Sequence, residues 1–183
     1  MSAVLFDDFG GDSPDLAARL IGARLLVDGV GGVIVETEAY RPDDPASHSF
    51  KGPNRTNGSM FGPSGHAYVY RSYGLHWCLN VVGEAAGAVL IRALEPEFGV
   101  ETMSVRRGFA RPLCAGPGRL TQALGVTGHH DGLSLRAPPF DLLHHDSGKV
   151  PLIVGPRIGI TKAIDQPWRF GLQGSAYLSR PFR

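Results

Sequence analysis

Apolar positions follow a helical period in one early segment of the chain. The residues Ser-Pro-Asp at 13–15 predict a helix start, because they supply a capping hydroxyl, a proline in the first turn and an acid near the positive end of the helix dipole. Leu16, Leu20 and Ile21 then form an apolar stripe, and Gly22 marks its end. The pattern therefore predicts an amphipathic helix before residue 22.

Most other apolar positions alternate or run together, which is typical of strands. Strands are predicted over 24–28, 31–40, 67–73, 77–82 and 88–94, with the first two joined as a hairpin at 29–31. Further helices are predicted over 97–107 and 117–124. Residues 41–66 are rich in Pro, Asp, Asn, Ser and Gly and predict a long ordered loop, a feature that is often functional. With no repeat or linker to divide the chain, we expect residues 1–183 to form one domain of strands and helices.

Composition narrows the class of protein. The chain has 183 residues, enough for a substantial core, and 43% of them are hydrophobic. Its 25 glycines and 14 prolines indicate many turns. The two cysteines, Cys78 and Cys114, form no metal or disulfide framework, and the N-terminus lacks a signal-peptide pattern. We therefore expect a cytoplasmic protein that has no membrane segment.

The net charge of +1 argues against a strongly basic protein, but its distribution is uneven. Residues 1–60 carry nine acids and five bases, whereas residues 61–183 carry eight acids and 13 bases. Of the 18 cations, 15 are arginines, which bind phosphate well through their planar guanidinium group. This layout permits one basic face on a nearly neutral protein.

The segment VIVETEAY at 33–40 carries the strongest chemical signal. Because strand side chains alternate, Ile34, Glu36, Glu38 and Tyr40 are predicted on one face. A carboxylate beside an aromatic ring on that face could activate water next to a stacked planar base. Two alternatives stand beside this interpretation. The glutamates could be ordinary surface acids, or, at about 6–7 Å apart along the strand, they could form the acid–base pair of a carbohydrate-cleaving enzyme.

The stretch GHAYVYRSYGLHWCLN at 65–80 is rich in aromatic residues. Tyr68 and Tyr70 share a predicted strand face, and Tyr73 precedes Gly74 at a predicted tight turn. Aromatic rings of this kind can stack on bases or enter a base step, although a strand-rich core would use the same residues.

A charged residue interrupts one of the apolar runs. Arg92 breaks the apolar run 89–94 and, if buried, needs a partner, for which Glu36 or Glu38 is predicted. A purely structural ion pair is the alternative.

The helix start GPGR places Gly116, Gly118 and Arg119 where backbone N–H groups and a cation could contact a phosphate.

In this order, the motifs resemble the alkyladenine (3-methyladenine) DNA glycosylases, the methylpurine glycosylases of base-excision repair, and most closely their compact bacterial members. The matching stretches are VETEAY (35–40), His48, NRTNGSMFGPSGHAYVY (54–70), YGLHWCLNV (73–81), VLIRALEP (89–96), CAGPGRLTQALG (114–125), RIGI (157–160) and RFGLQGS (169–175). The resemblance implies an α+β fold, a single mixed domain with a curved antiparallel β-sheet core and flanking helices.

The resemblance also implies roles for individual residues. Glu38 resembles the general base that activates water, and Arg92 and the carbonyl of Ile158 resemble the groups that hold that water. Tyr40, His48 and Tyr70 resemble the walls around the flipped base, and Asn80 resembles the residue that crowds the 2-amino group of guanine. Tyr73 resembles the wedge inserted into the duplex, although Leu75 and His76 beside it depart from the residues that relatives often carry.

The function implied is hydrolysis of the N-glycosidic bond of alkylated or deaminated purines in double-stranded DNA, by a monomer without metal or cofactor, near the bacterial nucleoid. No lysine lies within the matched pocket stretches, with Lys51 only near them, so simple hydrolysis is expected in preference to a Schiff-base lyase. The alternative is a non-catalytic module that binds damaged nucleic acid through the same aromatic residues.

Overall fold

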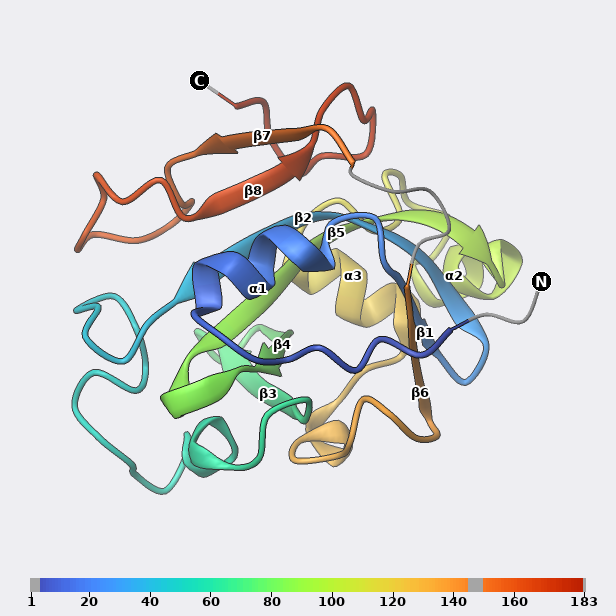
Figure 1. Ribbon diagram of the computed structural model, residues 1–183. Coiled ribbons are helices and arrows are strands. Elements are labelled where there is room, and N and C mark those ends of the chain that lie inside the picture. Colours follow the sequence, from blue (N-terminus) through green and yellow to red (C-terminus); the bar gives the residue numbers. More distant parts are fainter. Residues whose placement is uncertain (1–3, 145–149, 183) are drawn as a thin grey trace.

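The computed structural model describes residues 4–144 and 150–182 (Figure 1). The helices are α1 (Ser13–Leu20), α2 (Val100–Arg106) and α3 (Pro117–Leu124), with 3₁₀ turns η1 (Gly58–Phe61), η2 (Glu84–Ala86) and η3 (Gly128–His130). The strands are β1 (Arg24–Val27), β2 (Val30–Tyr40), β3 (Ala67–Ser72), β4 (His76–Val82), β5 (Ala88–Phe98), β6 (Phe140–Leu143), β7 (Leu152–Gly155) and β8 (Arg169–Leu172).

All these strands belong to one antiparallel sheet with the order β3-β4-β5-β2-β1-β6, to which β8 adds by pairing with β2, and β7 by pairing with β8. The sheet curls into a half-barrel, and the β7–β8 hairpin lies along its upper side in Figure 1. Helix α1 packs on β2 and β5, and α3 packs on β4 and β5. The predicted α+β class with a curved antiparallel sheet is confirmed. None of the helices in the described part of the chain has the length and apolar character needed to cross a bilayer.

The hairpin between β1 and β2 is tighter than the sequence predicted. Val27 pairs with Val30, so the turn consists of Asp28 and Gly29, whose φ angles of 50° and 74° are those of a type I′ turn. Glycine is required just beyond it, because a Cβ on Gly31 would lie 1.9 Å from the carbonyl oxygen of Leu25. Of the two glycines predicted in the turn, Gly29 remains there, whereas Gly31 belongs to β2 and lets that strand run close to its neighbour.

Other boundaries also differ from the prediction. Ser13 is the first residue of α1 and not its cap, because Asp12 holds the N-cap position and the Ser13 hydroxyl donates to the carbonyl of Tyr40 at 3.0 Å. Strand β5 continues to Phe98, which pairs with Gly31, and Gly99 turns the chain at φ 65°. Helix α2 thus starts at residue 100 and not at 97, because sheet pairing overrides the helical pattern of the residues before it.

Strand β2 does not keep strict alternation along its length. The β2–β5 register shifts between Ile34 and Glu36 and again between Glu36 and Thr37. Ile34 and Ala39 both belong to the main apolar core, although uninterrupted alternation would place them on opposite faces. The prediction that Ile34 shares the face of Glu36 is therefore wrong. The Thr37 hydroxyl donates to the carbonyl of Ala17 in α1, so the glutamates on either side of it face away from that helix.

Candidate active site

A cavity of about 610 Å³ opens on the face of the sheet where Glu38 of β2 lies. Its walls come from β2, β3, β4 and β5, from the loop 41–66 and from the segment after β7. Eight residues predicted from the sequence as site residues line it together: Glu38, Tyr40, His48, Tyr70, Tyr73, Asn80, Arg92 and Ile158. The three predicted phosphate-binding residues do not line this cavity: Gly116, Gly118 and Arg119. Pro117, which lies among them in the sequence, does.

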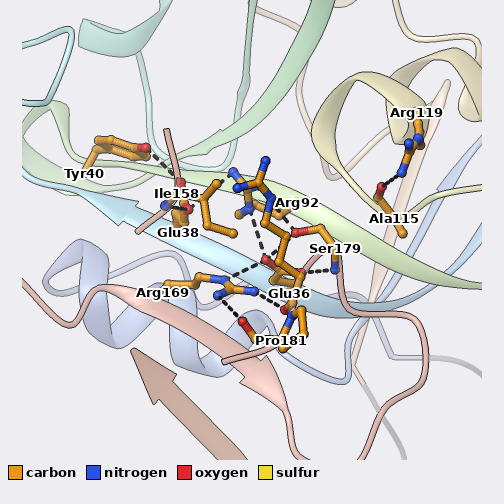
Figure 2. Close-up of polar contacts among 11 residues, drawn as sticks. Glu36, Glu38, Tyr40, Arg92, Ala115, Arg119, Ile158, Arg169, Ser179 and Pro181 are labelled. Carbon is orange, nitrogen blue, oxygen red and sulfur yellow. Dashed lines mark hydrogen bonds and ion pairs between the residues drawn. The ribbon is translucent and has the colours of Figure 1, made fainter. Parts of the chain in front are cut away.

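Glu38 lies at the base of the cavity and is fully buried. Its Oε1 accepts a hydrogen bond from the backbone N–H of Ile158 at 2.7 Å and lies 3.3 Å from Nη1 of Arg92. Its Oε2 accepts the hydroxyl of Tyr40 at 2.9 Å (Figure 2). Burial, and next the charge of Glu38, raise the pKa of Tyr40, so this phenol stays protonated and donates. Donors at both oxygens hold Glu38 in one orientation towards the cavity.

Glu36 is equally buried but does not line the cavity. It accepts hydrogen bonds from Nε of Arg92 at 3.1 Å, Nε of Arg169 at 2.8 Å, and both the N–H and hydroxyl of Ser179 at 2.5 and 2.8 Å (Figure 2). All four interactions are internal to the protein, so this carboxylate has no route to a substrate. The geometry thus removes the paired acid–base arrangement that a carbohydrate-cleaving enzyme would need.

Arg92 bridges Glu36 and Glu38. This confirms the prediction that a buried Arg92 needs a carboxylate partner. It is the extra residue of a bulge in β5, because Ala93 pairs with Glu36 and Ile91 with Thr37. Burial opposes the charged guanidinium, but Glu38 and Glu36 outweigh it and raise the pKa of Arg92. A permanent positive charge therefore lies beside Glu38.

The aromatic walls are held by contacts among themselves. The ring of His48 lies 4.5 Å from that of Tyr70, centroid to centroid, and its Nδ1 lies 2.9 Å from the hydroxyl of Tyr68. Burial lowers the pKa of His48, so its ring is neutral at pH 7. Within the long loop that carries His48, the buried Asn57 donates from Nδ2 to the His48 carbonyl at 2.9 Å. Asn80 is buried and donates from Nδ2 to the Tyr68 carbonyl at 3.0 Å.

Tyr73 lies at the rim of the cavity, on the turn between β3 and β4. It is 87% exposed, and its φ of 49° is in the left-handed region, as is that of Gly74 at 69°. Leu75 beside it is 79% exposed, whereas His76 packs against α3, where a Cβ on Gly118 would lie 2.7 Å from its ring. The turn therefore presents two exposed apolar side chains next to the opening.

The start of α3 uses its polar groups within the protein. The N–H of Gly116 donates to the carbonyl of Arg92 at 2.9 Å, and Nη1 of Arg119 donates to the carbonyl of Ala115 at 3.2 Å (Figure 2). The Gly116 N–H is thus not available to a phosphate. A phosphate contact at this helix stays a prediction and would depend on Arg119.

A family model described as methylpurine-DNA glycosylase (MPG) matches residues 7–176. The chain belongs to the methylpurine-DNA glycosylase family. Proteins of Nitrosospira multiformis, Rhodopseudomonas palustris and Rhizobium meliloti are 60%, 61% and 57% identical to it, over 96%, 92% and 96% of this chain and 93%, 86% and 96% of their own. Each carries the name "Putative 3-methyladenine DNA glycosylase". Family membership makes the chain a DNA glycosylase, a repair enzyme that binds DNA and hydrolyses N-glycosyl bonds.

Sequence reasoning missed one buried ion pair of this glycosylase. Arg157 and Asp44 pair through Nη1 and Oδ2, and both side chains are 0% exposed. The guanidinium also donates to the carbonyl of Ala39 at 3.0 Å and lies 4.7 Å from the centre of the Tyr40 ring and 5.2 Å from that of Trp168. The pair therefore ties the loop 41–66 to the back of a cavity wall. The residues are 113 positions apart, so no local pattern marks them as partners.

The sequence placed no lysine in the pocket stretches, and the structure corrects this expectation. Lys162 lines the cavity, four residues beyond Ile158, on a segment that the motif stretches did not include. Cys78 lines it too, and burial raises the pKa of its thiol, which keeps it neutral. The glycosylase thus has an amine near its site, on a residue outside the stretches that carry the family resemblance.

Proposed function

We propose that this glycosylase excises damaged purines, 3-methyladenine among them, from double-stranded DNA, by flipping the damaged nucleotide into the cavity and attacking its N-glycosidic bond with a water activated by Glu38. The observation that carries the proposal is the buried carboxylate of Glu38 at the base of a cavity walled by Tyr40, His48 and Tyr70. The names of the relatives, all 3-methyladenine DNA glycosylases, support the substrate class.

The chemistry fits this geometry. A base inside a duplex cannot be attacked at its sugar carbon, so it must leave the stack, and damaged bases pair and stack poorly, which lowers the cost by a few kcal/mol. A methylated purine carries positive charge and is therefore a good leaving group. Tyrosine faces favour such a cation, and the neutral ring of His48 does not repel it.

Each pocket residue then has a separate role. Glu38 takes a proton from the attacking water and stabilises the positive sugar that forms as the bond breaks. Arg92 and the carbonyl of Ile158 hold that water. Asn80 is fixed by its bond to the Tyr68 carbonyl and crowds the 2-amino group of undamaged guanine.

A base-release assay on a panel of duplexes, each with one modified purine, tests the proposal. The panel contains 3-methyladenine, 7-methylguanine, hypoxanthine, ethenoadenine and an unmodified control. We expect release of at least one modified purine and none from the control duplex. Tight binding of lesion duplexes without release of any base would favour the non-catalytic binding module instead.

Tyr73 is proposed as the wedge that fills the gap left by the flipped nucleotide. Replacement by alanine removes an exposed ring from the rim without touching the core, since Tyr73 is 87% exposed. Base stacking on an aromatic ring is worth about 1–3 kcal/mol, so we expect Tyr73→Ala to weaken lesion-duplex binding by about five- to 150-fold. A fluorescence titration at fixed salt measures this, and equal affinities of variant and wild type would exclude the wedge role.

Lys162 is proposed to contact DNA at the cavity mouth and not to form a Schiff base. Its side chain belongs to an exposed residue of the cavity lining, where a lysine attracts DNA phosphate. Borohydride traps an imine between an amine and an abasic sugar, so we expect no trapped protein–DNA adduct under conditions that trap a bifunctional glycosylase. An adduct that disappears in Lys162→Ala would instead identify a lyase.

A further inference from the structure

The guanidinium of Arg92 is held at each of its three nitrogen atoms by a different residue. Nε donates to Oε1 of Glu36 at 3.1 Å, Nη1 lies 3.3 Å from Oε1 of Glu38, and Nη2 donates to the hydroxyl oxygen of Ser179 at 3.4 Å. The guanidinium is planar and each of its terminal nitrogens carries two N–H donors, so these three contacts set the directions in which the Nη1 and Nη2 donors point.

Ser179 is placed to serve both partners of this network. Its backbone N–H donates to Oε2 of Glu36 at 2.5 Å and its hydroxyl donates to Oε1 at 2.8 Å. With its proton directed to Glu36, the hydroxyl presents its lone pairs to Arg92. Ser179 therefore fixes the carboxylate of Glu36, which accepts from Nε of Arg92. It also accepts a hydrogen bond itself from Nη2 of Arg92.

The segment that carries Ser179 is itself clasped by Arg169 on β8 (Figure 2). The Arg169 guanidinium donates to the carbonyls of Arg180 and Pro181 at 2.5 and 3.4 Å, and lies 3.8 Å from the centre of the Phe182 ring. Its Nε donates to Glu36. Residues 179–182 thus contact the sheet at Glu36 and Arg169, beyond residue 176, where the match to the family model ends.

We infer that Ser179 is a positioning residue for catalysis, which holds Arg92 so that its remaining donors face the water beside Glu38. The inference rests on the proposed function, because it gives Arg92 a role in the hydrolytic step. Glu36 becomes the anchor of this arrangement and takes no part in proton transfer. The competing explanation is a purely structural clasp, in which the same contacts only stabilise the C-terminal segment.

Single-turnover base release by the full-length Ser179→Ala variant separates the two explanations. Hydrogen bonds that involve charged groups are strong enough for their loss to change a rate by about tenfold, and we expect a decrease of that size. Affinity for a lesion duplex should stay within about twofold, because Ser179 is not among the cavity-lining residues. Ser179→Thr keeps the hydroxyl and should restore most of the rate.

Ser175→Ala is the matched control. Ser175 lies in the same segment, and its hydroxyl accepts only the N–H of Tyr177 among the described contacts, so we expect the wild-type rate. A Ser179→Ala variant that releases base at the wild-type rate would overturn the inference, whether or not its melting temperature falls. A decrease in rate that Ser179→Thr does not restore would overturn it too.

A second readout is independent of activity. In the protein without DNA, the Nε–H of Arg92 should exchange with water faster in Ser179→Ala than in the wild type or in Ser175→Ala, as followed by nitrogen-15 NMR. Unchanged exchange would contradict the positioning role. If the wild type released no base from any duplex, the proposed function would fail, and the exchange measurement would still decide whether Ser179 holds Arg92.

Discussion

Glu38→Gln is expected to lower the rate of base release by about two to four orders of magnitude, the usual contribution of a general base. The amide matches the carboxylate in size but cannot take a proton from water. It also disturbs the hydrogen bonds, because Oε1 accepts from Ile158 and Oε2 from Tyr40, and an amide offers only one acceptor oxygen. The positive sugar loses its nearest negative charge at the same time.

Single-turnover kinetics on the best duplex of the panel measures this loss, and a titration of the same duplex measures binding. We expect binding to stay within about threefold, because the aromatic walls are unchanged. Glu101→Gln is the control, since Glu101 is exposed at the start of α2, away from the cavity lining. Excision by Glu38→Gln at the wild-type rate would refute the mechanism.

Asp44→Ala is expected to destabilise the protein by about 3–5 kcal/mol, the typical cost of removing one partner from a buried ion pair. Both side chains of the Asp44–Arg157 pair are fully inaccessible, so Arg157 would be left without a carboxylate inside the protein. Native proteins are stable by only about 5–15 kcal/mol, so this is a large fraction of the total. We expect the catalytic rate to fall as well, because Arg157 supports the ring of Tyr40 from behind.

Urea unfolding gives the free energy, and the neighbouring residue provides the control. Asp43 pairs with Arg41 on the surface, so Asp43→Ala should change the free energy of unfolding little. Asp44→Asn keeps an acceptor oxygen and should lose less than alanine, which keeps the test open if Asp44→Ala does not fold. Equal unfolding free energies for the alanine variants at 43 and 44 would show that the buried pair contributes nothing beyond a surface pair.

The sequence by itself determined much of the local structure and the types of chemistry. Alternation over 33–40 put Glu38 and Tyr40 on one face of a strand, and the structure places both on the cavity. The cost of burying Arg92 predicted a carboxylate partner, and both candidates contact it. These predictions succeeded because they depend on strand geometry and on the desolvation of a charge, which act within a few residues or on a single side chain.

The resemblance singled out Glu38, but only the tertiary structure shows why Glu36 does not face the cavity. Bulges in β2 and β5 redirect the side chains around Glu36, and Ser179, 143 positions away, closes off its carboxylate. The pairing of Asp44 with Arg157 and the approach of Lys162 likewise join segments that no sequence period relates. Such contacts depend on how the sheet curls and on where its loops return to it. They are selected by the free energy of packing the whole domain, which no short stretch of sequence determines.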